Sequence, residues 1–243
     1  HGAVRTSKLS KIFKVSKVTI RLDLERLSQK GVIVREAGGA YLKSVPDLVR
    51  NIPLRNVQYP EQSIAIARTA VKFIEKGDNI ILDSGPTTTE IARLIQGRQD
   101  NLTIITSGLN IGLMLGSEKG EKNGIEVIFT GGHFKPMSLS NTGEITANFF
   151  EHIHADKLFL SAGGITMEGG LNYPFHSDIP VKKAMIRSAD IIYLVIPSYM
   201  MGRKMLASLG NVPVVDFLIT DSGIPTEYKT FFKDKNIEVI IGE

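Results

Sequence analysis

The sequence has no cysteine among its 243 residues. Neither a disulfide framework nor a thiolate metal site is therefore possible, which suits a reducing compartment. The chain also lacks any uninterrupted apolar stretch of about 18 residues, and no charged start leads into an apolar signal region. We therefore expect a cytoplasmic protein without a membrane partner.

Motifs that mark enzymes and cofactor-binding proteins are missing as well. The sequence contains no nucleophile elbow, no Walker loop and no complete dinucleotide fingerprint. Among its five histidines, His152 and His154 are two positions apart and share no helix face, and no carboxylate spacing accompanies them. We expect no catalytic residues, no cofactor and no metal site.

Positive charge is concentrated at the start of the chain. Residues 1–43 contain ten Lys or Arg against three Asp or Glu, a net charge of +7, whereas the remaining residues have a net charge of −3. An excess of this kind on one small segment suits contact with a phosphate backbone. A solubilising surface is the simpler alternative, but the motif in the same segment favours DNA.

That motif is a helix pattern followed by a hairpin pattern, in the segment Val15–Tyr41. Ser16 is a good N-cap, apolar residues recur up to Lys30, and Gly31 stands where helices commonly end. We expect the helix to bury one apolar face, formed by Val18, Ile20, Leu22, Leu24 and Leu27.

The surrounding residues complete a winged helix-turn-helix. An amphipathic segment, Thr6–Phe13, precedes the helix across a tight turn, and β-rich runs at 32–34 and 40–42 flank Gly38-Gly39 as in a wing. A capped helix with an exposed N-terminus can enter the major groove of DNA. This fold normally has one more helix, and only His1–Arg5 precede the pattern. We expect residues 1–43 to form a partial domain without its first helix.

The residue pattern changes after residue 43, which separates the first segment from the rest of the chain. Residues 44–60 contain three prolines and little periodicity, which predicts a linker. Residues 61–243 alternate helical patterns with β-rich runs, which predicts an α/β domain with a mainly parallel sheet covered on both faces. The expected strands are 80–82, 102–106, 125–130, 158–161, 191–196, 217–220 and 237–241, and the expected helices lie near 88–95, 110–115, 142–152, 179–189 and 226–233.

Three strand ends in this domain carry glycines and hydroxyls, in the loops 83–89, 106–110 and 130–133. Ligands of open parallel sheets bind at the carboxyl ends of strands. A loop that opens a helix there presents free amides and the positive end of the helix dipole to an anion. A phosphate is the natural ligand for the first loop, and further donors come from the hydroxyls of Ser84, Thr87, Thr88 and Thr89.

Other interpretations of the first loop remain open. Asp83 would repel a phosphate held against it, so we expect it to accept from a sugar hydroxyl or to pin the loop. A well-capped helix start is the alternative to a binding site, because Ser and Thr are common there in any case.

Together these residues resemble the DeoR-type bacterial transcriptional regulators over nearly the whole chain. The matching segments are Val15–Leu24, Gly31, Arg35 with Gly38-Gly39-Ala40, the Asp83–Thr89 and Thr106–Asn110 loops, Gly131-Gly132 and Lys182–Met185. The resemblance implies a repressor of a carbohydrate-metabolism operon. It also implies a sensor domain related to sugar-phosphate isomerase and CoA-transferase folds, which binds a phosphorylated sugar that alters the affinity for operator DNA. Homodimers or homotetramers are expected.

The resemblance also implies which residues bind each ligand. For double-stranded DNA these are Ser16, Lys17, Thr19 and Arg21 on the helix, with Arg35, Gly38 and Gly39 of the wing on the backbone. For the effector they are Asp83, Ser84, Gly85, Thr87, Thr88, Thr89, Ser107, Gly108, Leu109, Gly131 and Gly132, with Lys182 supplying positive charge.

Three departures from the family pattern bear on these expectations. Leu22 stands where a second Arg is common, and Pro86 replaces a usual Ser or Thr. The segment Pro197–Met200 replaces an Asp-x-Ser-Lys pattern, so that a carboxylate and an ammonium are both missing. We expect either a bulkier effector, with Arg203 or Lys204 supplying the charge, or a degenerate pocket that no longer responds to sugar phosphates.

An isomerase-like enzyme is the remaining alternative, because related folds isomerise pentose phosphates. Isomerisation requires a positioned base, usually a carboxylate. The segment Phe159–Ile165 lacks the acidic cluster of those isomerases, and a fused DNA-binding domain would be superfluous. We expect no enzyme activity.

Overall fold

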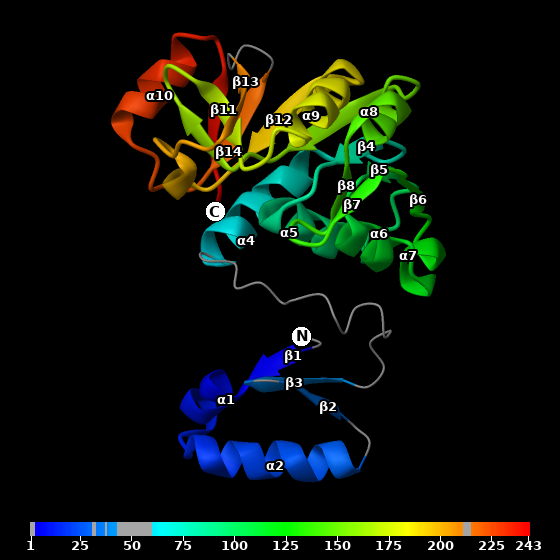
Figure 1. Cartoon of the computed structure of the whole chain (residues 1–243), viewed down its shortest axis with the longest axis vertical. Helices are drawn as coiled ribbons and strands as arrows, with labels where there is room; N and C mark the ends of the chain where they lie inside the picture. The colour runs from blue at the N-terminus through cyan, green and yellow to red at the C-terminus, as the bar shows by residue number, and fades with distance from the viewer. Residues whose placement is uncertain (1–2, 31–32, 37, 43–59, 211–214) are drawn as a thin grey trace. The chain divides into compact units, whose positions relative to one another are not determined.

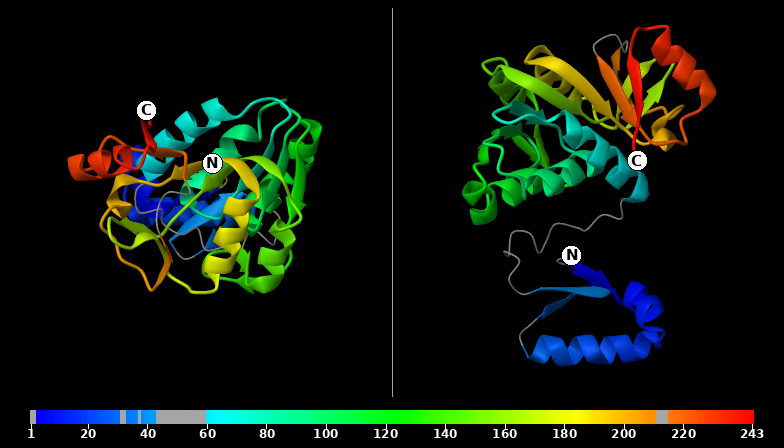
Figure 2. Two further views of the ribbon diagram at one scale, coloured as in Figure 1. Left: turned by 90° about the horizontal axis from the view of Figure 1, so that it is seen from above. Right: turned by 180° about the vertical axis from the view of Figure 1, so that it is seen from behind.

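The computed structural model describes residues 3–30, 33–36, 38–42, 60–210 and 215–243 (Figure 1, Figure 2). The chain divides into two compact units, His1–Arg55 and Asn56–Glu243. The predicted linker, residues 44–60, lies outside the described residues except for Pro60. Within the described ranges, no helix combines the length and the apolar character that crossing a membrane requires.

The first unit is a helix-turn-helix with a wing, as predicted. A short turn, residues 14–16, joins helices α1 (Thr6–Phe13) and α2 (Lys17–Gln29). Its first residue, Lys14, has a left-handed backbone with φ of 53°. The wing strands β2 (Ile33–Glu36) and β3 (Gly39–Leu42) are antiparallel. A third strand, β1 (Ala3–Arg5), was not predicted, and it pairs with β3 to give the order β1-β3-β2.

Helix α2 begins as the sequence predicts but buries fewer residues than expected. The Ser16 side chain accepts a hydrogen bond from the Thr19 amide at 3.0 Å. Only Ile20 and Leu24 are buried, where they form a small core with Ala40. Val18 and Leu22 are exposed, so our prediction of one continuous apolar face was wrong. Successive residues turn by about 100° on a helix, so Val18 cannot face inward together with Ile20.

The second unit is built on a seven-stranded sheet with the order β15-β14-β12-β9-β4-β5-β6. All its pairings are parallel, and all seven strands match predicted runs. Their bounds are β4 (Asn79–Leu82), β5 (Thr103–Thr106), β6 (Glu126–Phe129), β9 (Ala155–Leu160), β12 (Ala189–Val195), β14 (Phe217–Thr220) and β15 (Glu238–Ile241).

Helices cover both faces of this sheet, which explains why the central strand β4 and the second halves of β9 and β12 are apolar. Ile80 and Leu82 of β4 belong to one core cluster with α4, α5 and α6, and Ile81 between them belongs to the other with α8, α9 and α10 (Figure 1). The helices are α4 (Pro60–Ala70), α5 (Pro86–Ile95), α6 (Leu109–Leu115), α7 (Glu118–Lys122), α8 (Glu144–Phe150), α9 (Asp178–Arg187) and α10 (Thr226–Lys233).

Smaller elements that the sequence did not predict complete this unit. One is the hairpin of β7 (His133–Lys135) and β8 (Ser140–Thr142). The other is a three-stranded sheet of β10 (Gly164–Thr166), β11 (Gly170–Tyr173) and β13 (Ala207–Gly210). Short 3₁₀ helices follow α4 at Val71–Phe73 and β12 at Ser198–Met200.

The strand order places a topological switch point at the centre of the sheet. From β4 the chain winds outward through β5 to β6, returns to β9 beside β4, and then winds the other way through β12, β14 and β15. Ligands of open α/β sheets bind outside the carboxyl ends of strands at such a point. In this protein, that position belongs to the residues that follow Leu82 and Leu160.

Candidate functional site

Asp83 follows β4 at the switch point and anchors the first predicted loop. Its carboxylate is fully buried and accepts hydrogen bonds from the Ser84 amide at 2.6 Å and from the Ser161 amide and hydroxyl at 2.9 and 2.7 Å. It also forms an ion pair with the ammonium of Lys182 on α9. This geometry matches the loop-pinning role that we considered for Asp83, because its contacts tie the loop to β9 and α9.

Lys182 is nearly as buried as its partner. Besides the ion pair with Asp83, its Nζ lies 5.5 Å from the centre of the Tyr173 ring. The Tyr173 hydroxyl donates to the Ser161 carbonyl at 2.9 Å. Burial raises the pKa of Tyr173 well above its usual 10.0, and the carboxylates of Asp83 and Asp178 raise this pKa further. Tyr173 therefore remains a neutral hydrogen-bond donor behind the loop.

Free backbone donors gather where the loop opens helix α5. The amides of Gly85, Thr87 and Thr88 have no hydrogen-bond acceptor in the described part of the chain, and Pro86 between them has no amide. The first intrahelical bond runs from the Thr89 amide to the Gly85 carbonyl at 2.9 Å. Unpaired amides and the positive end of the helix dipole suit an anion.

The hydroxyls of this loop are less available than we expected. Thr88 and Thr89 both donate to the Gly85 carbonyl, at 3.0 and 2.7 Å, and Thr87 donates to the Ser63 hydroxyl at 3.4 Å. The hydroxyl of Ser84, which is half-buried, makes no hydrogen bond with the other described residues. Among these four hydroxyls, that of Ser84 is therefore the one that can donate a hydrogen bond to a ligand.

The second predicted loop packs directly against the first. A Cβ placed on Gly108 would lie 3.4 Å from the Cβ of Ser84, and the amide of Asn110's side chain donates to the Thr89 hydroxyl at 2.7 Å. Several polar groups of this loop are already bonded: the Leu109 amide donates to the Leu139 carbonyl at 2.7 Å, and the Ser107 carbonyl accepts from the Asn141 amide at 2.9 Å. Hairpin β7–β8 thus holds the second loop in place.

In the third loop, Gly132 packs against helix α8. Gly132 has φ of +131°, and a Cβ there would overlap the Thr146 hydroxyl, which donates to the Gly131 carbonyl at 2.8 Å. A Cβ on Gly131 would meet nothing within 4 Å. The close approach of α8 therefore accounts for the glycine at 132, whereas Gly131 has open space beside it.

Sequence reasoning missed a second charged pair near this edge. The Lys135 ammonium on β7 donates to the Asp178 carboxylate at 2.6 Å and lies 3.6 Å from the centre of the Phe175 ring. The Thr142 hydroxyl donates to the Ser177 carbonyl at 2.6 Å, just before α9. These contacts join residues more than thirty positions apart, so no local pattern pointed to them.

The last of the three departures from the family pattern, the segment Pro197–Met200, lies near β10 and β14. The Ser198 amide and hydroxyl both donate to the Asp221 carboxylate, each at 2.7 Å. Arg203 and Lys204, which we considered as substitutes for the missing charge, are exposed. The Arg203 backbone passes so close to Gly164 that a Cβ there would overlap the Arg203 carbonyl.

In the first unit, the residues predicted to contact DNA are mostly exposed. Lys17, Thr19 and Arg21 project from the start of α2, next to the Ser16 cap. Arg35 on β2 forms an ion pair with Glu25 of α2, which ties the wing to the helix. Gly38 has φ of +88°, and a Cβ on Gly39 would overlap the Val4 carbonyl of β1. The fold of the wing itself therefore explains why both positions are glycine.

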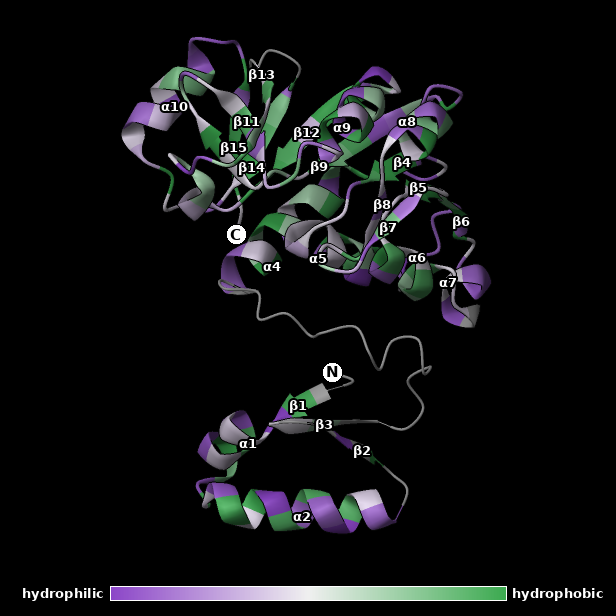
Figure 3. Cartoon of the chain, viewed as in Figure 1, coloured by the Kyte–Doolittle hydropathy of each residue, from purple (hydrophilic) through white to green (hydrophobic). Residues whose placement is uncertain are grey.

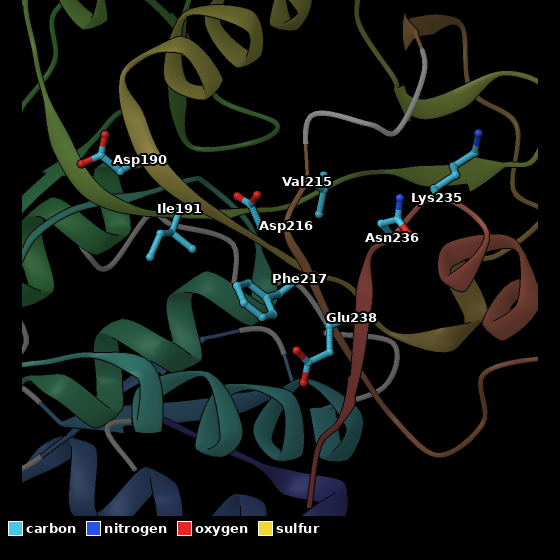
Figure 4. Close-up of a pocket in the computed structure, with 8 residues that line it drawn as sticks. All are labelled: Asp190, Ile191, Val215, Asp216, Phe217, Lys235, Asn236 and Glu238. Carbon is cyan, nitrogen blue, oxygen red and sulfur yellow. The ribbon is translucent and has the colours of Figure 1, made fainter.

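A shallow hollow of about 450 Å³ lies at the opposite edge of the large sheet, at the amino ends of β12, β14 and β15 (Figure 4). The carboxylates of Asp190, Asp216 and Glu238 line it together with Lys235. Excess negative charge makes this hollow unsuitable for a phosphate. Among the described residues, no group of three or more His, Asp or Glu side chains is placed to hold a metal ion.

Comparison with known proteins identifies the family. Residues 1–45 match the model of the DeoR-like helix-turn-helix domain, and residues 59–222 match that of the DeoR C terminal sensor domain. The chain belongs to the DeoR family. It is 33% identical over 243 residues to the HTH-type transcriptional regulator GolR of Listeria innocua, covering all of this chain and 94% of that protein. It is 29% identical to the glycerol-3-phosphate regulon repressor of Escherichia coli, covering 98% of this chain and 92% of that one.

These relatives place the chain among transcriptional regulators and not among enzymes, as the sequence predicted. Solved structures give weaker matches. Ribose 5-phosphate isomerase from Plasmodium falciparum aligns with a TM-score of 0.40 at 14% identity, over 57% of this chain and 52% of that one. The delta subunit of eIF2B from Chaetomium thermophilum aligns with a TM-score of 0.46 at 14% identity, over 65% and 54%. The chain thus spans about half the length of these proteins, and neither match decides its function.

Proposed function

We propose that this DeoR-family regulator is a repressor of a carbohydrate-metabolism operon and that a phosphorylated sugar controls its affinity for operator DNA. The observation that carries the proposal is the group of free amides at Gly85, Thr87 and Thr88, at the switch point of the sensor sheet. The relative named as the glycerol-3-phosphate regulon repressor supports a phosphorylated metabolite as the effector.

The charges around the amides suit a phosphate held at the mouth of the loop. Asp83 and Lys182 neutralise each other behind it, so the buried carboxylate does not repel an anion in front of α5. The amides and the Ser84 hydroxyl bind the phosphate, and Ser107, Gly108 and Gly131 form the rim for the sugar. In this proposal, Lys182 acts through Asp83 and not by direct contact with the effector.

DNA binding belongs to the first unit. Helix α2 enters the major groove with Ser16, Lys17, Thr19 and Arg21, and the guanidinium of Arg21 binds a guanine edge or a phosphate. The wing, with Arg35 and the two glycines, contacts the backbone. The net charge of +7 on residues 1–43 supports this assignment.

Control by the effector follows from linkage. A ligand that prefers one arrangement of the sensor subunits shifts the spacing of paired α2 helices, and only its differential affinity for the two arrangements can do so. We propose a homodimer or homotetramer that acts in the cytoplasm. The exposed apolar side chains of Phe129 on the edge strand β6, Phe134 on β7 and Met137 after β7 support contact between sensor subunits.

A regulator with a degenerate pocket is a second candidate, and one observation favours it. The Asp83–Lys182 pair and the bonded hydroxyls of Thr87, Thr88 and Thr89 leave few side-chain groups free for a ligand. In that case, the polar network only stabilises the fold.

Calorimetric titration of the whole protein with a panel of sugar phosphates separates the two candidates. The proposal predicts saturable binding of at least one member, which Ser84→Asp abolishes by placing a carboxylate beside the amides. Asn236→Asp adds the same charge at the opposite edge, where the hollow lies, and should leave binding unchanged. No heat from any member of the panel would favour the degenerate pocket, and loss of binding in Asn236→Asp alone would move the site to the hollow.

A further inference from the structure

Three large apolar side chains are exposed on the helix that we assign to DNA, and two of them, Val18 and Leu22, lie near its start. Val18 and Leu22 of α2 are 62% and 58% exposed, whereas Ile20 and Leu24 of the same helix are 5% exposed. Polar and apolar segments accordingly alternate along α2 in Figure 3. The core of the unit therefore does not explain why residues 18 and 22 are apolar.

Helix geometry places the two side chains together near the start of the helix. Residues four apart lie one above the other on a helix surface, so Val18 and Leu22 form one small patch. They are the second and sixth residues of α2, which begins at Lys17 after the Ser16 cap. A recognition helix contacts base edges with its N-terminal residues, and the patch lies within that part of α2.

Charge around the patch favours DNA as its partner. Lys17 and Arg21 are exposed next to it, and three further lysines, Lys8, Lys11 and Lys14, are exposed on α1 and in the turn. An apolar patch within so much positive charge is poorly suited to an apolar protein surface, because the cations would lose their hydration on contact. In a major groove the same cations meet phosphates, and an apolar side chain meets the only apolar group on a base edge, the 5-methyl group of thymine.

We propose that Val18 and Leu22 read thymine methyl groups in the major groove and thereby help to set the operator sequence. The inference rests on the proposed function, because it requires α2 to enter the groove. It also gives a role to Leu22, which stands where an Arg is common in the family: an Arg at this position could bind guanine, whereas Leu22 contacts thymine.

The test uses duplexes selected by the whole protein from a random-sequence library and then resynthesised with deoxyuridine in place of thymine. This change removes the methyl group and keeps the charge and the hydrogen-bonding edge. We expect the Kd of the wild-type protein to rise about fourfold for each methyl group that is read, the effect of leaving one methylene-sized group unburied. Leu22→Ala should lose this sensitivity at one thymine position, and Val18→Ala at another.

Two further variants keep the result interpretable. Ile12→Ala removes an exposed apolar side chain from α1 in the same unit, and it should retain the wild-type ratio of the two Kd values. Leu22→Arg should shift the selected base pair from T·A towards G·C, because Arg binds the O6 and N7 atoms of guanine. Circular dichroism establishes that each variant is folded.

The outcomes separate this inference from the proposed function. If DNA binds and Arg21→Ala weakens binding, but deoxyuridine has no effect on the wild-type protein, the methyl inference is wrong and the function stands. If Leu22→Ala leaves the sensitivity to deoxyuridine intact and instead changes the subunit count in sedimentation, the patch is a protein interface. If the library yields no enriched duplex, the proposed function itself fails.

Discussion

Replacing Lys182 with Met tests the polar network at the switch point most severely. The substitution keeps most of the side-chain volume but removes the ammonium that pairs with Asp83, whose carboxylate has no solvent exposure. Breaking a buried ion pair by removing one partner costs about 3–5 kcal/mol, because the other charge stays buried. Asp83 keeps its bonds from Ser84 and Ser161, which places the expected cost near the lower limit, about 3 kcal/mol.

Urea unfolding followed by far-ultraviolet circular dichroism measures this cost, since the sequence contains no tryptophan for fluorescence. Lys183→Met is the matched control: this neighbouring lysine is exposed on α9, and its replacement should change stability by no more than about 0.5 kcal/mol. The double variant Asp83→Asn with Lys182→Met should lose less than the sum of the single losses. A cost below about 1 kcal/mol for Lys182→Met would refute the reasoning, because the pair would then behave as a solvent-screened one.

Three further predictions concern other parts of the molecule. Arg21→Ala should weaken operator binding by about tenfold or more in fluorescence anisotropy while leaving effector affinity in calorimetry intact; equal losses of both would contradict a two-module protein. The folded protein holds the pKa of Tyr173 above the 10.0 of the unfolded chain, so the unfolded chain loses the Tyr173 proton at a lower pH than the folded protein does. The free energy of unfolding should therefore fall as the pH rises past about 10. Tyr173→Phe should make that alkaline decline shallower in thermal unfolding, and an unchanged slope would assign the decline to other groups. Gly132→Ala should destabilise the sensor unit because of its φ of +131° and the overlap with α8, whereas Gly131→Ala, with open space beside it, should have little effect on the melting temperature; equal effects would contradict this account of the third loop.

The large sheet was predictable because its central strands are buried on both faces. Runs such as Ile80–Leu82 and Ile191–Val195 are apolar at every position, and their alternation with helical patterns indicates a covered parallel sheet. The strands β1, β7 and β10 have three residues each, too few to show alternation, and their pairing depends on residues elsewhere in the chain. These short strands were therefore beyond sequence reasoning.

The candidate site was predictable in its location but not in its internal contacts. A glycine and hydroxyls after a buried strand indicated the Asp83–Thr89 loop, and the strand order then placed it at the switch point. The pairing of Asp83 with Lys182 joins residues 99 positions apart, so the family resemblance pointed to Lys182 only as a positive charge for the effector. Val18 and Leu22 show the same limit, because an apolar residue on a helix pattern does not say whether it faces a core or a partner.

The most direct test of the account measures operator affinity by fluorescence anisotropy with and without a sugar phosphate that binds in calorimetry. We expect the ligand to change the Kd for DNA of the wild-type protein and of Asn236→Asp, whereas Ser84→Asp should bind DNA normally but no longer respond to the ligand. A Ser84→Asp protein that responds like the wild type would contradict this expectation, because an anion bound at the start of α5 could not then be the signal.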